Sequence, residues 1–442
     1  MASHSNQGSS FVFLSTLLLM FLLRKRNSGR GRIARRPRSV WMRKMCRHRN
    51  SGHSATLLPL LRESDPQYFY DYMRMVPATF DRLLSLVENS IRRQDTNWRE
   101  CIPARTRLEI TLRFLASGDS QRSLSYAFQV ARSTVSEVIA ETSQAIWDNL
   151  KDDYVRCPRT PEEWMNIARG FLQRWNVPNC IGNLDGKHVT VEVPCNSGSE
   201  NFNYKGAFSK ILLAMCDSAY KFLYVDVGRC GGESDGGVFR RCDLSGALES
   251  QQLGVPEPAM LPGGNVTPYV IPGDEAFPLK PYLMRPYPKR FITSDAERIY
   301  NYRLSRGRRV IENAFGILTS RWRILRRRFK ATDENVNRYV LASVALHNFL
   351  MTLNEEKNRY CPSAFVDTES WNGNLIKGEW RKEKGTVPIF SSVSRLGSNK
   401  PSKLSEQVRE NFKDYFMGHG RVEWQLGYIH RNAPRVQPTT AQ

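Results

Sequence analysis

A chain of 442 residues with 40% apolar and 11% aromatic residues can form two or three domains with a substantial core, which excludes a wholly disordered protein. Lys and Arg outnumber Asp and Glu by 65 to 43, and the net charge of +22 favours a polyanionic partner, nucleic acid before an anionic membrane surface. The nine cysteines are odd in number, scattered and without a C-x-x-C pair, which argues against a zinc ribbon or disulfide framework and favours reduced thiols inside a cell.

We interpret residues 1–62 as a basic, disordered N-terminal arm. Its apolar run 11–23 is uncharged but shorter than the roughly 20 residues that span a bilayer. No Lys or Arg precedes the run and no small-residue cleavage site follows it, so we expect a packing segment and no membrane contact. Twelve Lys and Arg between Arg24 and Arg49 include the runs RKR and RRPR, which fit a phosphate-binding arm or a nuclear-import signal and hence a nuclear location.

Residues 63–155 are predicted to be all helical. One helix is indicated by the apolar stripe Phe80, Leu83, Leu84 and Val87, and another by residues 105–116. A short helix at 123–129, a three-residue break and a longer helix then predict a helix-turn-helix. Ser133 and Thr134 can cap the longer helix, and the candidate DNA-contacting residues at its leading edge are Arg132, Ser133, Thr134 and Ser136. Three packed helices that do not bind DNA are the alternative.

Residues 160–355 mix helices with strands. Helical patterns stand at 160–174, 235–245, 306–330 and 335–353. Strand-like or apolar runs stand at 210–216, 222–227 and 268–273. The run 180–191 predicts two strands around the turn Asp185-Gly186, because Asp-Gly is the strongest short hairpin signal. Residues 356–442 form a polar C-terminal extension with a short helix at 408–417.

Three acids are candidates for one site. Asp185 and Asp274 each end a strand-like run, and Glu312 lies on a helix face opposite the apolar stripe. Carboxylate oxygens are the ligands that Mg²⁺ prefers, and two such ions can bind the attacking and leaving oxygens of a phosphoryl displacement. Acids in these settings are also common without a metal, and on its own Asp185 fits a simple hairpin turn.

Several dissimilar motifs stand in order along nearly the whole chain. They are FQVARSTVSEVI (128–139), LDGKHV (184–189), NYKGAFS (203–209), MCDSAYKFLYVDVG (215–228), SDGGVF (234–239), GDEAFPLKPYLMRPYP (273–288), IYNYRLSRGRRVIENAFGIL (299–318), LHNFL (346–350) and VRENFKDYFMGHGRVEWQ (408–425). In this order they resemble the PIF/Harbinger transposase family and the host proteins derived from it.

The resemblance implies an α/β fold, in which an RNase H-like catalytic domain with a mixed sheet flanked by helices follows an all-α helix-turn-helix domain. It implies an Asp-Asp-Glu triad of Asp185, Asp274 and Glu312 that holds Mg²⁺ or Mn²⁺. Asp235 is the rival for the second position. Expected partners are DNA, a Myb-like DNA-binding protein and a second copy of the chain. The expected function is a two-ion endonuclease or transposase; the alternative is a domesticated, catalytically silent protein that binds DNA or chromatin.

Further residues are assigned from their chemistry. Arg308 and Arg309, with Lys205 and Arg306, are candidates for binding DNA phosphates. The run 321–330 is basic with interleaved aromatics and adds Arg321 and Arg323 to these candidates. His188 is expected to be a structural or site-wall residue, and His347 and Asn348 are expected to be satisfied polar groups in the core.

Overall fold

The computed structural model describes residues 42–97, 100–193, 199–203, 205–382, 391–392 and 401–431. The chain divides into two units, one ending at Arg47 and one beginning at His48. Within the described residues, the first unit contains α2 (Lys44–Arg47). The apolar run 11–23 and the basic runs after it lie outside the described residues. Nowhere in the described part of the chain does a helix combine the length and apolar character needed to cross a membrane.

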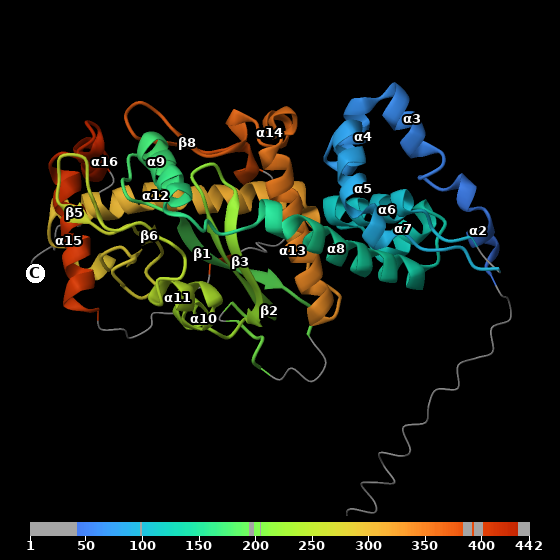
Figure 1. Cartoon of the computed structure of the whole chain (residues 1–442), viewed down its shortest axis with the longest axis horizontal. Coiled ribbons are helices and arrows are strands. Elements are labelled where there is room, and N and C mark those ends of the chain that lie inside the picture. The colour runs from blue at the N-terminus through green and yellow to red at the C-terminus, as the bar shows by residue number, and fades with distance from the viewer. Residues whose placement is uncertain are drawn as a thin grey trace, which may run out of the picture. The chain divides into compact units, whose positions relative to one another are not determined.

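The second unit opens with a helical region, coloured blue to teal in Figure 1. Its elements are η1 (Arg49–Ser51), α3 (Leu57–Ser64), α4 (Pro66–Met73), α5 (Pro77–Ile91), α6 (Ala104–Ser117), α7 (Gln121–Ala127) and α8 (Arg132–Tyr154). The prediction of a disordered arm up to residue 62 is wrong from His48 onward. Leu58 of α3 is buried, and the Ser54 hydroxyl donates a hydrogen bond to Glu109 of α6, so this segment packs on the helices that follow it.

Helices α7 and α8 are separated by residues 128–131. Ser120 caps α7 by accepting a hydrogen bond from the backbone N–H of Ser123. The predicted cap of α8 is wrong, because Ala131 occupies the N-cap position and Ser133 and Thr134 lie inside the first helical turn. Arg132 and Ser133 are exposed, whereas Thr134 and Ser136 are partly buried. The assignment of a helix-turn-helix stays a prediction.

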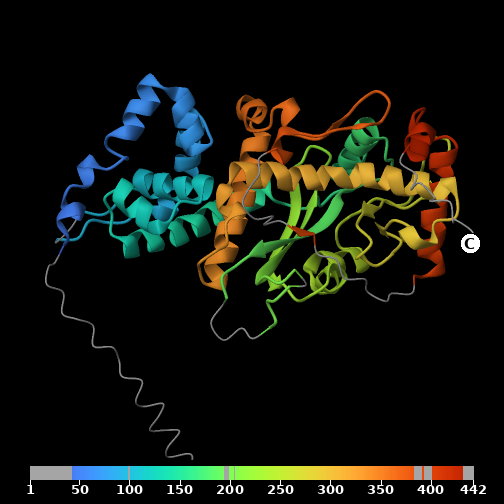
Figure 2. The same ribbon diagram turned by 180° about the vertical axis from the view of Figure 1, so that it is seen from behind.

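A four-stranded antiparallel sheet follows, in the order β10-β1-β2-β3 (Figure 1 and Figure 2). Its strands are β1 (Asn183–Thr190), β2 (Ser209–Cys216), β3 (Phe222–Cys230) and β10 (Ser391–Ser392). The predicted hairpin at Asp185-Gly186 is wrong. Strand β1 passes through both residues without a break, pairing with β2 from Asn183–Cys216 to Thr190–Ser209. Before β1, Cys180 forms a parallel bridge with Val270.

Short elements connect the sheet to the long helices. These are α9 (Pro161–Trp175), α10 (Asp235–Arg241), α11 (Asp243–Glu249), β4 (Ala259–Met260), β5 (Val266–Thr267), β6 (Ile271–Pro272), β7 (Leu283–Met284) and η2 (Lys289–Phe291). Strands β4 and β5 pair antiparallel, and β6 pairs in parallel with β7.

The longest helix, α12 (Asp295–Arg321), contacts β1 and β2 (Figure 1 and Figure 2). It starts 11 residues before the predicted residue 306, because Ser294 and Glu297 form a capping box there. It also ends before the predicted residue 330. The basic segment after it contains η3 (Arg323–Arg326) and precedes α13 (Asp333–Thr352).

One hydrophobic core runs from the helical region to the sheet. Val138 and Ile146 of α8 belong to the same cluster of buried residues as Leu212 of β2 and Val340 of α13. Helix α13 contacts both α8 and β3. The mixed α/β class predicted from the sequence is therefore confirmed. The RNase H-like assignment and the predicted domain limits, including the boundary at 155–160, stay predictions.

The C-terminal extension continues with α14 (Asn354–Tyr360), η4 (Ser363–Phe365), β8 (Thr368–Glu369), β9 (Leu375–Ile376), η5 (Glu379–Arg381), α15 (Lys403–Met417) and α16 (Gln425–Arg431). Helices α15 and α16 contact α12, as does η5. The antiparallel pair β8–β9 lies in residues 363–381, which we call the strap. The strap is fixed to α12 because the Asn313 side chain exchanges hydrogen bonds with the backbone of Asp367.

Candidate metal centre

Three aspartates from three separate segments meet beside β1. Asp185 lies on β1, Asp235 is the first residue of α10, and Asp274 follows β6. Each offers one carboxylate oxygen, and the three oxygens lie within 4.8 Å of one another. Asp185 and Asp235 are fully buried, and the Asp274 carboxylate accepts a 2.9 Å hydrogen bond from the backbone N–H of Ala276. Among the described residues this is the group of acids best placed to share a cation.

Two glycines permit this close approach. A Cβ atom on Gly186 would lie 2.0 Å from Oδ1 of Asp235, and a Cβ atom on Gly236 would lie 2.9 Å from the carbonyl oxygen of Ala276. Both distances are far below van der Waals contact, so any side chain would push α10 or its neighbours away. Because Gly186 has no side chain, the Asp235 carboxylate can lie directly against β1. The glycine serves this close contact within a continuous strand and not a turn, so the predicted turn is wrong.

The cluster is electrostatically costly without a cation. Burial raises the pKa of Asp235 well above its ordinary value, and the charges of Asp185 and Asp274 raise it further. Burial also raises the pKa of Asp274, although Arg308 opposes this. Within the described residues, nothing donates a hydrogen bond to either carboxylate oxygen of Asp235. Buried, mutually repelling oxygens that lack donors fit a hard divalent cation, which binds oxygen ligands.

Two basic side chains partly balance the acids. Lys187 is two residues after Asp185 on the same strand, is 7% exposed, and places Nζ 2.7 Å from Oδ2 of Asp185. Arg308 of α12 places a guanidinium nitrogen 3.8 Å from Oδ1 of the same carboxylate. Sequence reasoning missed Lys187. A continuous strand puts residues two apart on one face, so the false turn concealed the signal.

Glu312 lies outside this group of aspartates. It follows Arg308 by four residues on α12, which is just over one turn, or about 6 Å along the helix axis. Its half-exposed carboxylate lies 3.4 Å from a guanidinium nitrogen of Arg381 in the strap, and Arg381 also binds Asp367 at 2.6 Å. The structure thus brings together Asp185, Asp274 and the less favoured candidate Asp235. The catalytic roles of all four acids stay predictions.

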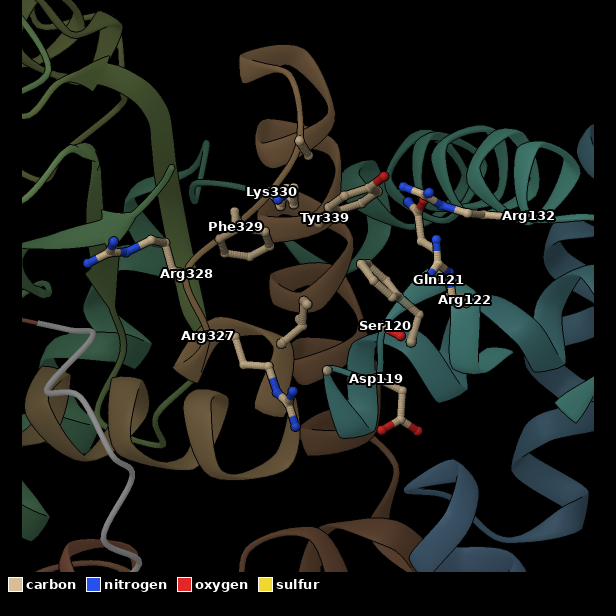
Figure 3. Close-up of a pocket in the computed structure, with 14 residues that line it drawn as sticks. Asp119, Ser120, Gln121, Arg122, Arg132, Arg327, Arg328, Phe329, Lys330 and Tyr339 are labelled. Carbon is tan, nitrogen blue, oxygen red and sulfur yellow. The ribbon is translucent and has the colours of Figure 1, made fainter. Parts of the chain in front are cut away.

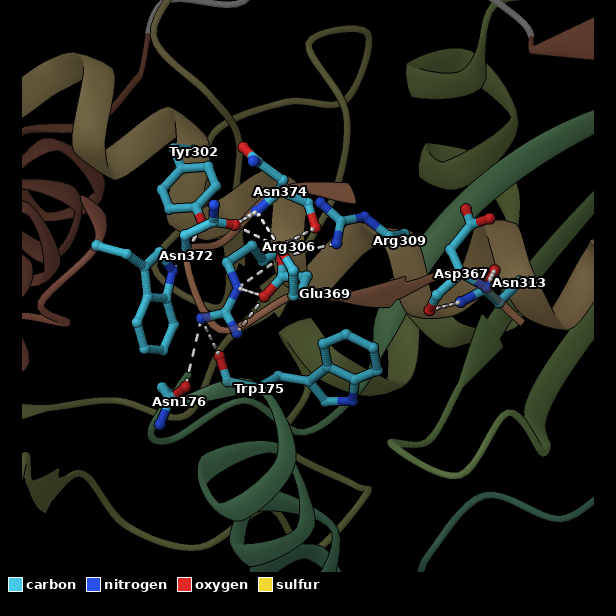
Figure 4. Close-up of polar contacts among 12 residues, drawn as sticks. Trp175, Asn176, Tyr302, Arg306, Arg309, Asn313, Asp367, Glu369, Asn372 and Asn374 are labelled. Atoms are coloured by element: carbon cyan, nitrogen blue, oxygen red, sulfur yellow. Dashed lines mark hydrogen bonds and ion pairs between the residues drawn. The ribbon is translucent and has the colours of Figure 1, made fainter. Parts of the chain in front are cut away.

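Three of the arginines predicted to bind DNA have structural partners. Arg309 and Arg306 both pair with Glu369 of the strap at 2.7 Å, and all three side chains are nearly buried (Figure 4). Arg321 donates a 2.7 Å hydrogen bond to the carbonyl of Tyr360 and lies 4.4 Å from the Phe365 ring centroid. Both side chains are therefore occupied in holding the segment after α13, and the assignments of Arg309 and Arg321 to DNA stay predictions.

The other polar residues agree with their predicted structural roles. His188 is buried, its Nδ1 lies 3.0 Å from the Ser209 hydroxyl, and burial lowers its pKa to about 4. His347 contacts the hydroxyl of Tyr360 and the carbonyl of Tyr220. Asn348 accepts a hydrogen bond from the backbone N–H of Phe222 and donates to its carbonyl. The prediction that His347 and Asn348 are satisfied core groups is confirmed.

The raised pKa values predict how the metal-free protein responds to pH. The unfolded chain releases the protons of Asp235 and Asp274 near pH 4, whereas the folded chain retains them to higher pH because both pKa values are raised. The free energy of unfolding is therefore largest below pH 4 and falls as the pH rises through the raised pKa values of the folded chain. We expect Asp235→Asn, without metal, to melt higher than the parent at pH 7.5, by about 2–4 °C for each kcal/mol regained, and to lose this advantage towards pH 4.

Thermal melts in EDTA at pH 4 to 8 measure this difference. Asp243→Asn is the matched control, because it makes the same change at an exposed position on α11 outside the cluster. A metal-free Asp235→Asn variant that melts below the parent at pH 7.5 would contradict the charge repulsion in the cluster.

Comparisons with known proteins are consistent with this site. Residues 184–348 match the family model of the DDE superfamily endonucleases, a range that contains Asp185, Asp235, Asp274 and Glu312. The chain is 28% identical over 302 residues to the Arabidopsis thaliana protein named Antagonist of like heterochromatin protein 1, covering 65% of this chain and 74% of that protein. It is 25% identical over 306 residues to the Arabidopsis thaliana Protein ALP1-like, covering 66% and 73%.

A further relative is the Bos taurus protein named "Putative nuclease HARBI1", which is 25% identical over 269 residues and is covered to 72% of its length, against 60% of this chain. No solved structure matches the chain significantly. The sequence relatives and the family model together point to one group of proteins with a nuclease-type domain.

Proposed function

Because the chain belongs to the Harbinger- and ALP1-like family of DDE superfamily endonucleases, we propose that it is a divalent-metal-dependent DNA endonuclease or transposase. The observation that carries the proposal is the convergence of Asp185, Asp235 and Asp274, with one oxygen of each within 4.8 Å of the others. A buried site of this charge has little structural value by itself, since three neighbouring carboxylates destabilise a folded protein unless a cation or protons neutralise them.

Each residue has a role in this mechanism. Asp185, Asp235 and Asp274 would hold Mg²⁺ or Mn²⁺. The bound cation supplies polarisation of a phosphodiester oxygen and a lower pKa for the attacking water or DNA 3′-hydroxyl. Lys187 holds the Asp185 carboxylate in place from the same strand. Arg308, partly exposed beside that carboxylate, binds a non-bridging oxygen of the phosphate that is attacked.

Glu312 would provide a further oxygen ligand for a second ion. Its carboxylate is bonded to Arg381, so this role requires that the contact with the strap be exchanged for the ion. The same contact favours the second candidate function, a silent protein that keeps the fold to bind DNA or chromatin. The name of one relative refers to a heterochromatin protein, which fits that candidate.

A cleavage assay distinguishes the two functions. The full chain is incubated with duplex DNA in Mg²⁺, in Mn²⁺ and in EDTA, and products are resolved on a denaturing gel. The nuclease predicts strand cuts with either metal and none in EDTA, and a rise of melting temperature on adding metal because ligand binding stabilises the folded state. Metal-independent cutting, or DNA binding without a cut in either metal, would exclude the proposed enzyme, and the second of these results supports the silent function.

Location and partners are parts of the same proposal. The net charge of +22 and the basic runs within Arg24–Arg49 support a nuclear protein that binds DNA. A Myb-like DNA-binding protein and a second copy of the chain are proposed as further partners on the family resemblance.

A further inference from the structure

A groove of about 580 Å³ lies between the helical region and the segment that follows α12. Figure 3 shows Arg122 of α7 and Arg132 of α8 on one side of the groove and Arg327 and Arg328 on the other, with the Arg328 guanidinium directed away from the first two residues and Lys330 lying in the middle beside Tyr339. These two sets of residues are about 200 positions apart in the sequence. The fold brings them together because α6 contacts η3 directly.

The groove is strongly cationic. All five of these basic side chains are exposed. Its one acid, Asp119, is paired with Arg113 at 3.2 Å, and Lys330 is paired with Glu192 at 3.3 Å. Across the described part of the chain, no carboxylate lies within ion-pair distance of Arg122, Arg132, Arg327 or Arg328. Such unneutralised guanidinium groups on two facing walls attract a polyanion whose charges are repeated along its length.

The wall formed by residues 327–330 is joined to the strand that carries Asp185. The backbone N–H of Phe329 donates a 3.0 Å hydrogen bond to the carbonyl of Thr190, and the N–H of Glu192 donates a 2.8 Å bond to the carbonyl of Phe329. Phe329 is therefore bridged to Val191 next to the end of β1. Six residues of extended chain separate Val191 from Asp185, which is about 20 Å at roughly 3.3 Å per residue.

The wall that carries Arg122 and Arg132 is held at a fixed spacing from the wall formed by residues 327–330. Gly118, the C-cap of α6 with φ +67°, has no side chain, and the Arg327 side chain passes over it so closely that a Cβ atom there would lie 2.8 Å from Nε. Beneath the groove, the ring of Phe114 in α6 lies edge-to-face against Tyr339, and the ring of Phe329 stacks on the same tyrosine. The two walls thus share one buried aromatic floor and keep a fixed spacing.

We propose that this groove binds the sugar-phosphate backbone of the DNA duplex on which the metal centre acts, an inference that rests on the proposed function. Guanidinium groups match phosphate oxygens in a bidentate geometry, and unneutralised cations on both walls suit a chain of phosphates. With about 3.4 Å per nucleotide along one strand, a span of about 20 Å places the bound phosphates roughly six nucleotides from the bond that is cut. The groove fixes where along the duplex the centre acts.

The test uses the full chain in EDTA, so that binding is measured without cleavage. Fluorescence anisotropy of a labelled 30-base-pair duplex is followed against salt for the parent and for Arg132→Gln/Arg328→Gln, one change on each wall. Each lost phosphate contact lowers the slope of log K against log salt by about 0.9, so we expect a slope smaller by about two and a duplex affinity at least 10-fold weaker. The matched control is Arg169→Gln/Lys289→Gln, an equal loss of charge at exposed positions on α9 and η2 outside the groove.

Two results would overturn the inference. One is a groove variant with the slope and affinity of the control variant. The other is equal competition by poly-glutamate at the same charge concentration, which would make the occupant an acidic peptide. Failure of the proposed function is separate, because it appears as a parent chain that binds the duplex in EDTA but does not cut it in Mg²⁺ or Mn²⁺. Lost binding by the groove variant together with parental binding by the control variant supports the inference.

Discussion

We expect Asp235→Asn to abolish the proposed metal-dependent DNA cleavage, with a rate lower by about 10³-fold or more. The change keeps the shape of the side chain and removes a carboxylate that shares the centre with Asp185 and Asp274. Loss of a ligand that positions a catalytic cation costs several kcal/mol of transition-state stabilisation, and each 1.36 kcal/mol is a factor of ten in rate. Initial rates on a labelled duplex in saturating Mn²⁺ measure the effect, with Asp243→Asn as the control that leaves the rate unchanged.

Glu312→Gln gives the decisive comparison. The sequence alone places Glu312 in the triad and Asp235 as an alternative, whereas the folded chain has Asp235 in the cluster and Glu312 bonded to Arg381. A cluster of three aspartates predicts a deeper loss for Asp235→Asn than for Glu312→Gln. If Glu312→Gln eliminates cleavage and Asp235→Asn leaves it near the parental rate, the cation is bound by Asp185, Asp274 and Glu312, and Asp235 is not a ligand.

Gly186→Ala is expected to eliminate cleavage although it removes no ligand. The new methyl group would lie 2.0 Å from Oδ1 of Asp235, so α10 must shift or the carboxylate must rotate out of the centre. Overpacking of this kind costs about 1–3 kcal/mol of folding stability. We therefore expect a lower melting temperature, no further stabilisation by Mg²⁺ or Mn²⁺, and a rate reduced as far as in Asp235→Asn.

Two further variants test whether the clash with Asp235 causes the predicted loss. Gly246→Ala inserts the same methyl group into open space on α11, where it leaves cleavage intact and is neutral or stabilising by about 0.5–1 kcal/mol. Gly186→Ala/Asp235→Ala removes the group with which the methyl clashes, so its stability recovers while its activity does not. A Gly186→Ala protein that keeps the parental metal response would show that the close contact between β1 and α10 does not hold the centre together.

The sequence predicted which acids to consider better than it predicted the secondary structure around them. Asp185 and Asp274 were singled out because each ends an apolar run, and that property is local. The hairpin at Asp185-Gly186 was wrong because Gly186 serves a contact with Asp235, which lies 49 residues later and which no local pattern encodes. The start of α12 was missed for a different reason, since the capping box at Ser294 is local but lies before the apolar stripe that marked the helix.

The basic residues show the same limit more clearly. Arg308 and Arg309 are neighbours with identical chemistry, yet one faces Asp185 and the other is bound by Glu369, 60 residues later in the chain. The partner of Arg309 belongs to the strap, whose polar composition gave no sign that it folds back on α12. Net charge thus predicted the class of partner, while the residues that remain available for that partner depend on which arginines the fold already uses.

The neighbours of β1 also determine when the cluster of aspartates can assemble during synthesis of the chain. Besides β2, the strand or its flanks pair with Val270, Phe329 and Ser391–Ser392. At about 5–20 residues per second, the ribosome needs roughly 10–40 s to reach these last residues after Thr190 has been made. Throughout that interval one edge of the strand carrying Asp185 lacks its partner, and Asp274 joins the cluster only part of the way through. A nascent chain on the ribosome therefore has no cation centre until its second half has emerged, and it needs protection from edge-to-edge association during the same period.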